Sequence, residues 1–519
     1  MRYVTGILIS LLLLVAASAF SQKASLIRIE IPAALESGAF QVEAIGKDGM
    51  LIFYESNEMT EDNLRKWYFG LFDTKLDRKW IKFVALRDNI HYIKSVRNGR
   101  KVHFLFRSAK TSPVEGDFYV IVNYDIAKQA FSNISGTIPK DAEINGFEAI
   151  GNTGCLGINL KKHGTDVLFI NLGNGEIKAQ TLEPENDSYI ETVGADPENK
   201  HFYVALKYAD ENRNLNDKLY RFSAHGEEQK TFTIAGQEGL KILRNFIFLP
   251  VKDNKLTIFG TYDMPTGKTM NLKDLEDDEE ARGVGIFMLR YENDAQTMLK
   301  YYDFLSFENI SGSFSGREVS FSKKKDGKEG EQKVKNLTAF YHFLAPEVKK
   351  KDGQYIFSVE IYKPVYKMIT QMEYDFYGRP VPQTYSVFDG YTFYDFILAG
   401  IAPDGALVWN NDFELKDMRS YFLKPHVALF EDNRFLSMAY VSKGKLHSKT
   451  IDGSLDINED EVSLETQFPK DRVTEDENNS IVHWYDNYFL VYGYQRLKNR
   501  TMNEQPVRTV FFANKVAYN

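Results

Sequence analysis

Leu26-Ile27-Arg28-Ile29-Glu30-Ile31 alternates polar and apolar residues, the pattern of a half-buried β-strand, and no partner strand follows it before residue 39. At the other end of the chain, the last predicted strand, Val507 to Phe512, is followed only by residues 513–519. That remainder is too short for a turn and another full strand. We therefore expect the first strand to pair beside the last, which would close a ring of sheets.

Between these ends, a strand-rich unit recurs about eight times, with most spacings roughly 47–54 residues, a period typical of propeller blades. Each unit has an apolar strand, an aromatic-rich strand, a polar turn such as Gly173-Asn174-Gly175, and a third strand. The first strands of the units are Met50–Tyr54, Val102–Phe106, Cys155–Leu160, Phe202–Leu206, Leu256–Tyr262, Tyr355–Ile361, Phe435–Val441 and Tyr488–Tyr494.

These repeats predict an all-β fold, a closed β-propeller of seven to eight four-stranded blades with eight favoured. The fourth strand of each blade is expected just before the first, as at Gly146 to Ala149. The N-terminal strand would complete the last blade. Two successive β-sandwiches are the alternative, but the linker rich in Gly, Pro or Ser that would separate them is not visible.

The first 21 residues have the features of a secretory signal peptide. Arg2 precedes an apolar segment from Ile7 to Ala17, and Ala17-Ser18-Ala19 offers small residues for cleavage. A short membrane anchor is the alternative, but about 11 apolar residues do not span a bilayer of roughly 30 Å. No cysteine follows for lipid attachment. We expect residues 22–519 to form a single propeller domain, secreted or periplasmic, without a transmembrane segment.

Composition narrows the expected partners. The net charge of −8 disfavours nucleic acid, and the 30 Tyr and 38 Phe favour strands. The one cysteine, Cys155, lies in an apolar alternation and is expected to be buried and inert. We expect a monomer.

Three insertions interrupt the repeat, at 263–283, 307–334 and 362–391. The first contains the acidic run 274–280, the second contains Lys323-Lys324-Lys325, and the third is rich in aromatic residues. Strands are counted here from the one that precedes each first strand in the chain. Counted so, connections from the second to the third strand of a blade and connections between blades leave a propeller on the same face. All three insertions are therefore expected to gather on one face, as loops over blades five and six.

The aromatic insertion supplies the candidate binding residues, because tyrosines on loops offer large amphipathic contact area for protein or glycan partners. The alternative is that the insertions pack on one another and the tyrosines cap the core. The candidates are Tyr362, Tyr366, Tyr374, Phe376, Tyr377, Tyr385 and Tyr391.

The sequence offers no catalytic or metal signature, so no metal, cofactor or catalytic residue is assigned. The nine histidines lack metal-pair spacing. The calcium-like run starting at Asp456 has Glu461 where the loop requires glycine. Asp389 and Asp395 are a carboxylate pair whose separation the sequence does not give.

The signal ending in Ser21-Gln22, the Tyr/Phe-rich repeats and Tyr488-Phe489-Leu490-Val491-Tyr492-Gly493-Tyr494 resemble secreted β-propeller-like proteins of Bacteroidota type. That resemblance covers nearly the whole mature chain and implies no established activity. The first functional hypothesis is an exported, non-enzymatic propeller that binds a protein or glycan through the insertion-bearing face. The alternatives are a hydrolase or lyase acting on an extracellular polysaccharide or peptide, and a structural envelope component.

Overall fold

The structure is a computed structural model that describes residues 27–517, except 36–37, 110–116, 161–163, 184–186, 212–214, 237–240, 266–280, 308–318, 326–330, 338–340, 375, 432–433 and 502–505. The predicted signal peptide and the acidic run 274–280 lie outside the described residues. Helical structure in the described part includes the short 3₁₀ turns η1 (Gly46–Asp48) and η4 (Phe304–Ser306). No helix there is both long and apolar enough to cross a bilayer.

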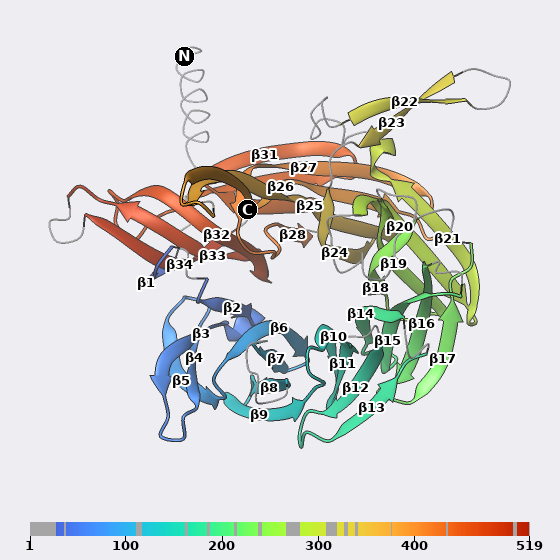
Figure 1. Cartoon of the computed structure of the whole chain (residues 1–519), viewed down its shortest axis with the longest axis horizontal. Helices are drawn as coiled ribbons and strands as arrows, with labels where there is room; N and C mark the ends of the chain where they lie inside the picture. The colour runs from blue at the N-terminus through green and yellow to red at the C-terminus, as the bar shows by residue number, and fades with distance from the viewer. Residues whose placement is uncertain are drawn as a thin grey trace, which may run out of the picture.

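The described residues form eight four-stranded antiparallel sheets arranged as the blades of a propeller (Figure 1). In blades 1 to 7 the strands follow one another in chain order from the central axis outward, so the predicted fourth strand is innermost. Blades 1 to 4 consist of β2 (Gln41–Ala44), β3 (Met50–Met59), β4 (Arg65–Phe72), β5 (Arg78–Leu86); β6 (Ile90–Asn98), β7 (Lys101–Ser108), β8 (Phe118–Asp125), β9 (Ala130–Thr137); β10 (Glu143–Ile150), β11 (Thr153–Asn159), β12 (Thr165–Asn171), β13 (Ile177–Thr181); and β14 (Ser188–Asp196), β15 (His201–Ala209), β16 (Leu215–Ser223), β17 (Glu228–Thr233). Blades 5 to 7 consist of β18 (Ile242–Phe248), β19 (Lys255–Pro265), β20 (Ala281–Glu292), β21 (Ala295–Asp303); β24 (His342–Lys351), β25 (Gln354–Tyr374), β26 (Pro380–Ile401), β27 (Leu407–Ser420); and β28 (Ala428–Glu431), β29 (Leu436–Ser442), β30 (Lys445–Asp452), β31 (Leu455–Ser463). Blade 8 runs inward from β1 (Ile27–Pro32) through β34 (Val507–Ala517) and β33 (Tyr488–Lys498) to β32 (Arg472–Tyr485).

The core lies between blades. Eight clusters of buried apolar residues each join one blade to the next, and the eighth joins blade 8 back to blade 1. Between blades 1 and 2, for example, Phe53 meets Phe104 edge to face with ring centroids 5.0 Å apart. Each fully buried side chain of this size contributes about 1.5–3 kcal/mol. This circular core confirms the predicted propeller.

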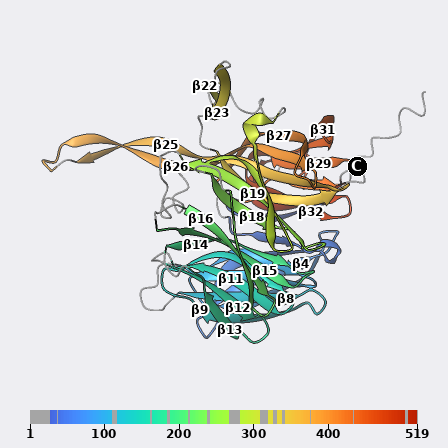
Figure 2. The ribbon, with the colours of Figure 1, turned by 90° about the vertical axis from the view of Figure 1, so that its right-hand side faces the viewer.

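The insertions contain more strand than the sequence predicted. Residues 307–334 include β22 (Val319–Lys325) and part of β23 (Glu331–Leu337), which pair as a hairpin. The aromatic insertion is not a loop, because β25 and β26 continue through it as paired strands up to a turn at Phe376 to Arg379. In Figure 2 this hairpin projects well beyond the blades.

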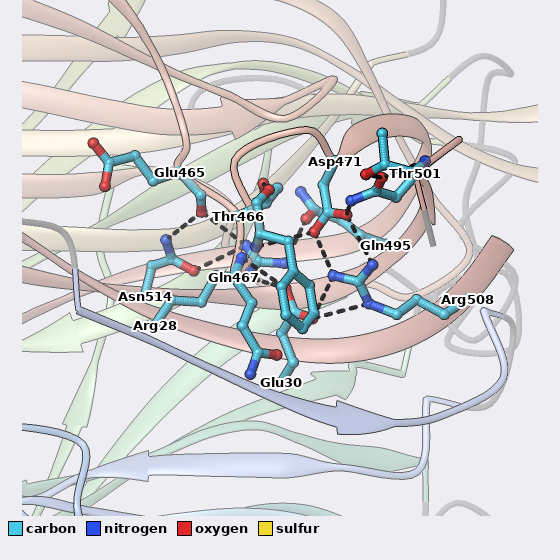
Figure 3. A network of polar contacts seen from close by, with 12 residues as sticks. Arg28, Glu30, Glu465, Thr466, Gln467, Asp471, Gln495, Thr501, Arg508 and Asn514 are labelled. Atoms are coloured by element: carbon cyan, nitrogen blue, oxygen red, sulfur yellow. Dashed lines mark hydrogen bonds and ion pairs between the residues drawn. The ribbon is translucent and has the colours of Figure 1, made fainter. Parts of the chain in front are cut away.

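The two chain ends meet as the sequence predicted. β1 pairs antiparallel with β34, with Ile29 opposite Ala513 and Pro32 opposite Val510, and so forms the outer strand of blade 8. Figure 3 shows the polar contacts that cross this junction: the Arg508 guanidinium lies between the carboxylates of Glu30 and Asp471. Arg28 donates to the Gln495 side chain at 2.9 Å. We call these contacts the closure network.

A β-bulge recurs on the innermost strands of blades 3, 5 and 8. In each, two residues that begin with asparagine, at Asn145, Asn245 and Asn478, stand opposite a single glycine of the next strand. The bulged backbone folds over that glycine. At Gly493, a Cβ would come within 2.4 Å of an oxygen of Asn479 and 2.9 Å of its Cα. The bulge therefore requires glycine at this position.

Candidate functional site

The projecting hairpin is a two-stranded ribbon with no other sheet neighbour. β25 pairs with β24 only as far as Tyr362, and β26 pairs with β27 only from Tyr391 onward. Between those points, the described residues of 363–390 (the ribbon) pair with no strand outside β25 and β26. Pro380 and Pro382 are tolerated on β26 because a strand of an isolated ribbon has a free outer edge. Gly378, with φ of 74°, provides the left-handed residue of the turn.

The ribbon has two chemically different faces, because directly paired residues of antiparallel strands share a face. One face, here the charge-free face, holds no ionisable acid or base apart from tyrosine. Its Thr370 and Thr384 hydroxyls lie 3.1 Å apart. The charge-free face consists of Tyr366, Met368, Thr370, Met372 and Tyr374 on β25 and of Phe388, Ser386, Thr384, Pro382 and Pro380 on β26.

The opposite face, here the polar face, carries the charges of the ribbon. Lys367 Nζ lies 2.7 Å from a carboxylate oxygen of Asp389, and this hydrogen bond lowers the pKa of Asp389. Tyr385 donates its hydroxyl proton to Glu373. Lys367, Asp389 and Glu373 are thus paired within the ribbon, whereas large apolar groups of the charge-free face are exposed, with Met368 at 68% and Tyr374 at 76%.

The seven sequence-predicted residues divide into two groups. Tyr362, 6% exposed, and the partly buried Tyr391 pack in the core between blades 6 and 7, as the packing alternative expected. Five residues are exposed on the ribbon: Tyr366 and Tyr374 lie on the charge-free face, Tyr385 lies on the polar face, and Phe376 and Tyr377 form the turn. Phe376 is 97% exposed.

A polar pocket of about 260 Å³ lies at the base of the ribbon, between blades 6, 7 and 8. It opens on the same face as the ribbon. The β29–β30 turn beside it joins the second and third strands of a blade, as the ribbon does, and the β27–β28 connection joins two blades; both kinds of connection leave a propeller on one face. Its lining residues are Asp389, Asp417, Met418, Arg419, Ser420, Tyr421, Val441, Ser442, Lys443, Asp476, Glu477, Asn478 and Asn479.

Three of the lining carboxylates have partners of their own. Asp389 pairs with Lys367, and Asp417 lies 2.6 Å from Lys443 Nζ, which lowers the pKa of Asp417. Asp476 accepts hydrogen bonds from the Gly444 amide at 2.7 Å and from the Asn479 side chain at 2.8 Å. Burial raises the pKa of Asp476 despite these bonds. The pocket thus combines compensated charge with many hydrogen-bonding atoms.

Behind the pocket, a buried polar network joins the same three blades. The Glu360 carboxylate on β25 accepts from the His426 and Val427 amides at 2.7 and 2.8 Å, and burial raises the pKa of Glu360 to about 8. His426 Nδ1 lies 2.7 Å from the carbonyl oxygen of Asn479. Lys424 Nζ donates to the carbonyl oxygen of Asn478 at 2.6 Å. These contacts position the bulge of β32.

The proposed carboxylate pair is not brought together at this pocket. Asp389 lines the pocket, but Asp395 is fully buried in β26, opposite Ile361 and Glu414, and does not line it. Across the described residues, no group of three or more His, Cys, Asp or Glu side chains is placed to hold a metal ion. Cys155 is buried as expected, and burial raises the pKa of its thiol.

Sequence reasoning missed the pocket entirely. Its residues come from segments up to about 90 positions apart, so no local motif marks it. The one available signal was the repeated asparagine bulge, in Ile144-Asn145-Gly146-Phe147, Arg244-Asn245-Phe246-Ile247 and Glu477-Asn478-Asn479-Ser480.

No protein-family model and no curated protein matches the chain. Among solved structures, it is similar to the β-propeller domain of the Trilobed protease from Pyrococcus furiosus (10% identity, TM-score 0.33, covering 83% of this chain and 100% of that one). It is also similar to polysaccharide lyase Uly1 (9%, TM-score 0.33, 83% and 90%) and to prolyl endopeptidases (8%, TM-score 0.37, 90% and 54%). Similarity at this level transfers no activity to the chain.

Proposed function

We propose that this chain is an exported, non-enzymatic β-propeller that binds a protein partner through the charge-free face of the ribbon. The propeller acts as a rigid base, and the ribbon carries the contact surface away from the blades. The single observation that carries the proposal is the separation of charge: ten paired positions on one face of the ribbon without a charged side chain, and ion-paired residues on the other.

The composition of the charge-free face matches the centre of a protein interface. Such centres are enriched in aromatic residues and methionine and depleted of charged residues. Met368 and Met372 add adaptable apolar contact area, while Tyr366 and Tyr374 add large amphipathic rings. Exposed apolar surface of this kind on a soluble chain marks an interaction site.

A protein is favoured over a glycan for this face. A glycan site needs polar groups that hydrogen-bond the sugar hydroxyls, besides aromatic rings for stacking. The charge-free face offers only the hydroxyls of Thr370, Thr384, Ser386 and its tyrosines, and Thr370 and Thr384 bond to each other. The amides of Gln371 and Gln383 and the carboxylate of Glu373 lie on the polar face.

Site-specific photo-crosslinking tests the proposal. A photoreactive residue placed at Met368 on the charge-free face is compared with the same residue at Gln371 on the polar face, in living cells that export the chain. The expected result is a discrete protein adduct from position 368 and at least about tenfold less from position 371. Equal adducts from both faces, or none from either, would reject the proposal.

A pair of charge-insertion variants then links the adduct to the face. Met372→Glu should abolish the crosslink from position 368, because burying an unpaired carboxylate in an apolar contact costs several kcal/mol. Gln383→Glu, on the polar face, is the matched control and should leave it intact. Sedimentation velocity of the purified chain shows whether the partner is a second copy, and crosslinking after glycosidase treatment shows whether it is a glycan.

A further inference from the structure

The three asparagine bulges form a comparison within one chain. Asn145 donates its side-chain amide to the carbonyl oxygen of Ile190, and Asn245 donates to Thr261 Oγ1 at 2.9 Å. Asn245 and Asn478 match more closely, since both have left-handed backbones, with φ of 52° and 54°. The first two bulge asparagines thus use their side chains to hold the fold together.

The third bulge asparagine does not. Asn478 is 3% exposed, lines the pocket at the base of the ribbon, and its amide nitrogen has no hydrogen-bond partner among the described residues. Its side-chain oxygen has only Ser420 Oγ, at 3.4 Å. The single proton of that hydroxyl points to the nearer carbonyl oxygen of Phe422, at 2.9 Å.

This geometry leaves a polar atom of Asn478 for a ligand. The side-chain oxygen faces Ser420, and the amide nitrogen is without an acceptor among the described residues. Leaving a buried polar atom unpaired costs about 1–3 kcal/mol. A fold that satisfies the same side chain in two other blades, and leaves it unsatisfied only where it lines a pocket, indicates a binding group.

From this we infer that the pocket between blades 6, 7 and 8 is a binding site for one neutral sugar unit, with the Asn478 side chain as its buried anchor. The site is separate from the charge-free face of the ribbon and does not depend on the protein partner proposed above. It would allow the chain to bind a saccharide at the base of the ribbon.

The charges of the pocket select a neutral ligand. Four carboxylates and two cationic groups line it, which disfavours an anion. Asp389 and Asp417 are each paired with a lysine, and one oxygen of Asp476 accepts hydrogen bonds from two amides. With three of the four carboxylates paired in this way, and no metal-holding group among the described residues, the pocket offers a ligand mainly hydrogen-bonding atoms.

The shape and the rim of the pocket agree with a sugar. Its volume of about 260 Å³ lies just below the roughly 300–1,000 Å³ usual for sites of drug-sized ligands, and therefore suits a single ring. Hydroxyl groups both donate and accept, so they satisfy Asn478 in either orientation. Tyr421, about half exposed at the rim, offers an aromatic surface for the apolar face of the ring.

Direct binding measurements test the assignment. The full mature chain is titrated with glucose, galactose, mannose, rhamnose and N-acetylglucosamine, and with glucuronate and galacturonate, and binding is followed by saturation-transfer NMR and calorimetry. At least one neutral sugar should bind, and the uronate of the same ring should bind about tenfold more weakly or worse. Failure of every neutral sugar at about 10 mM, or preference for a uronate, would overturn the inference.

Two glycine variants separate a binding role from a structural one. Asn478→Gly keeps the left-handed backbone and removes the unpaired amide, so it should abolish sugar binding without lowering the melting temperature. Asn245→Gly, the matched control, should keep sugar binding and lower the melting temperature, because it loses the bond to Thr261. If Asn478→Gly destabilises the chain as Asn245→Gly does, or retains binding, the amide is a structural group and the inference is wrong.

Discussion

Glu360 shows how one buried side chain makes the stability of this propeller depend on pH. Its pKa is about 8 in the folded chain against an ordinary value of 4.5, because burial penalises the carboxylate. A raised folded pKa stabilises fully below pH 4.5, and this stabilisation is lost as the pH rises toward 8, at about 1.4 kcal/mol per pH unit. Glu360→Gln keeps the acceptor for His426 and Val427 and cannot ionise.

We therefore expect Glu360→Gln to match the natural chain near pH 4.5 and to melt progressively higher than it does between pH 5 and 8. Thermal unfolding at pH 4.5, 6 and 8 measures this difference. Glu414→Gln, an exposed change on the neighbouring strand β27, controls for the loss of one negative charge. Parallel pH profiles for the natural chain and Glu360→Gln would contradict the assignment.

From the sequence alone, Cys155 could be predicted as a buried thiol. The raised pKa of Glu360 and the unpaired amide of Asn478 could not be predicted. A buried cysteine is marked by its apolar neighbours. The environment of Glu360 comes from residues 426–427, and that of Asn478 from Ser420, both more than 50 positions away. Tertiary contacts alone create these two sites, so no local pattern indicates them.

Among the elements, the ribbon is expected to contribute little to the stability of the propeller. Its described residues pair with no strand outside β25 and β26, and the aromatic side chains that do pack on the core, Tyr362 and Tyr391, lie at its base. Replacing residues 366–388 by an Asn-Gly turn should shift the melting temperature by less than about 2 °C. Tyr362→Ala, by contrast, should cost about 3 kcal/mol by emptying a buried site. A large loss on removing the ribbon would show that it supports the fold.

The strands of the blades were predictable, while the ribbon was not. Blade strands such as Phe202 to Leu206 bury an apolar side, which produces a readable pattern. β25 is 21 residues long, against the usual 3–10, and buries nothing along its outer half. The insertion thus contains prolines, charged residues and aromatic residues together, which is the composition of a loop. Only its aromatic residues indicated a binding surface.

For the whole molecule, the closure network should make the ring sensitive to acid. Burial alone would raise the pKa of Asp471, but hydrogen bonds from Arg508 and Asn499 outweigh it and lower the pKa. A lowered folded pKa contributes stability above the ordinary value of 3.8, and this is lost as the pH falls through the folded pKa. Asp471→Asn should therefore cost about 1–3 kcal/mol at pH 7, since it removes one of the two carboxylates that hold Arg508 and leaves only Glu30, and it should flatten the acid limb of unfolding below pH 4.

Closure itself was readable from the sequence, because two incomplete ends of a repeat require each other, and it leads to a direct test. A chain that begins at residue 34 lacks β1, leaves β34 as an open edge and removes Glu30 and Arg28 from the closure network. It should melt several degrees lower than a chain that begins at residue 22, and a synthetic peptide of residues 24–33 should restore the difference in a saturable way. A peptide with Ile29 and Ile31 replaced by Asp keeps the length but loses the apolar side of the strand, and it should not restore stability. If the shortened chain melts like the intact one, the eight inter-blade cores alone hold the circle shut, and the junction of the ends is dispensable.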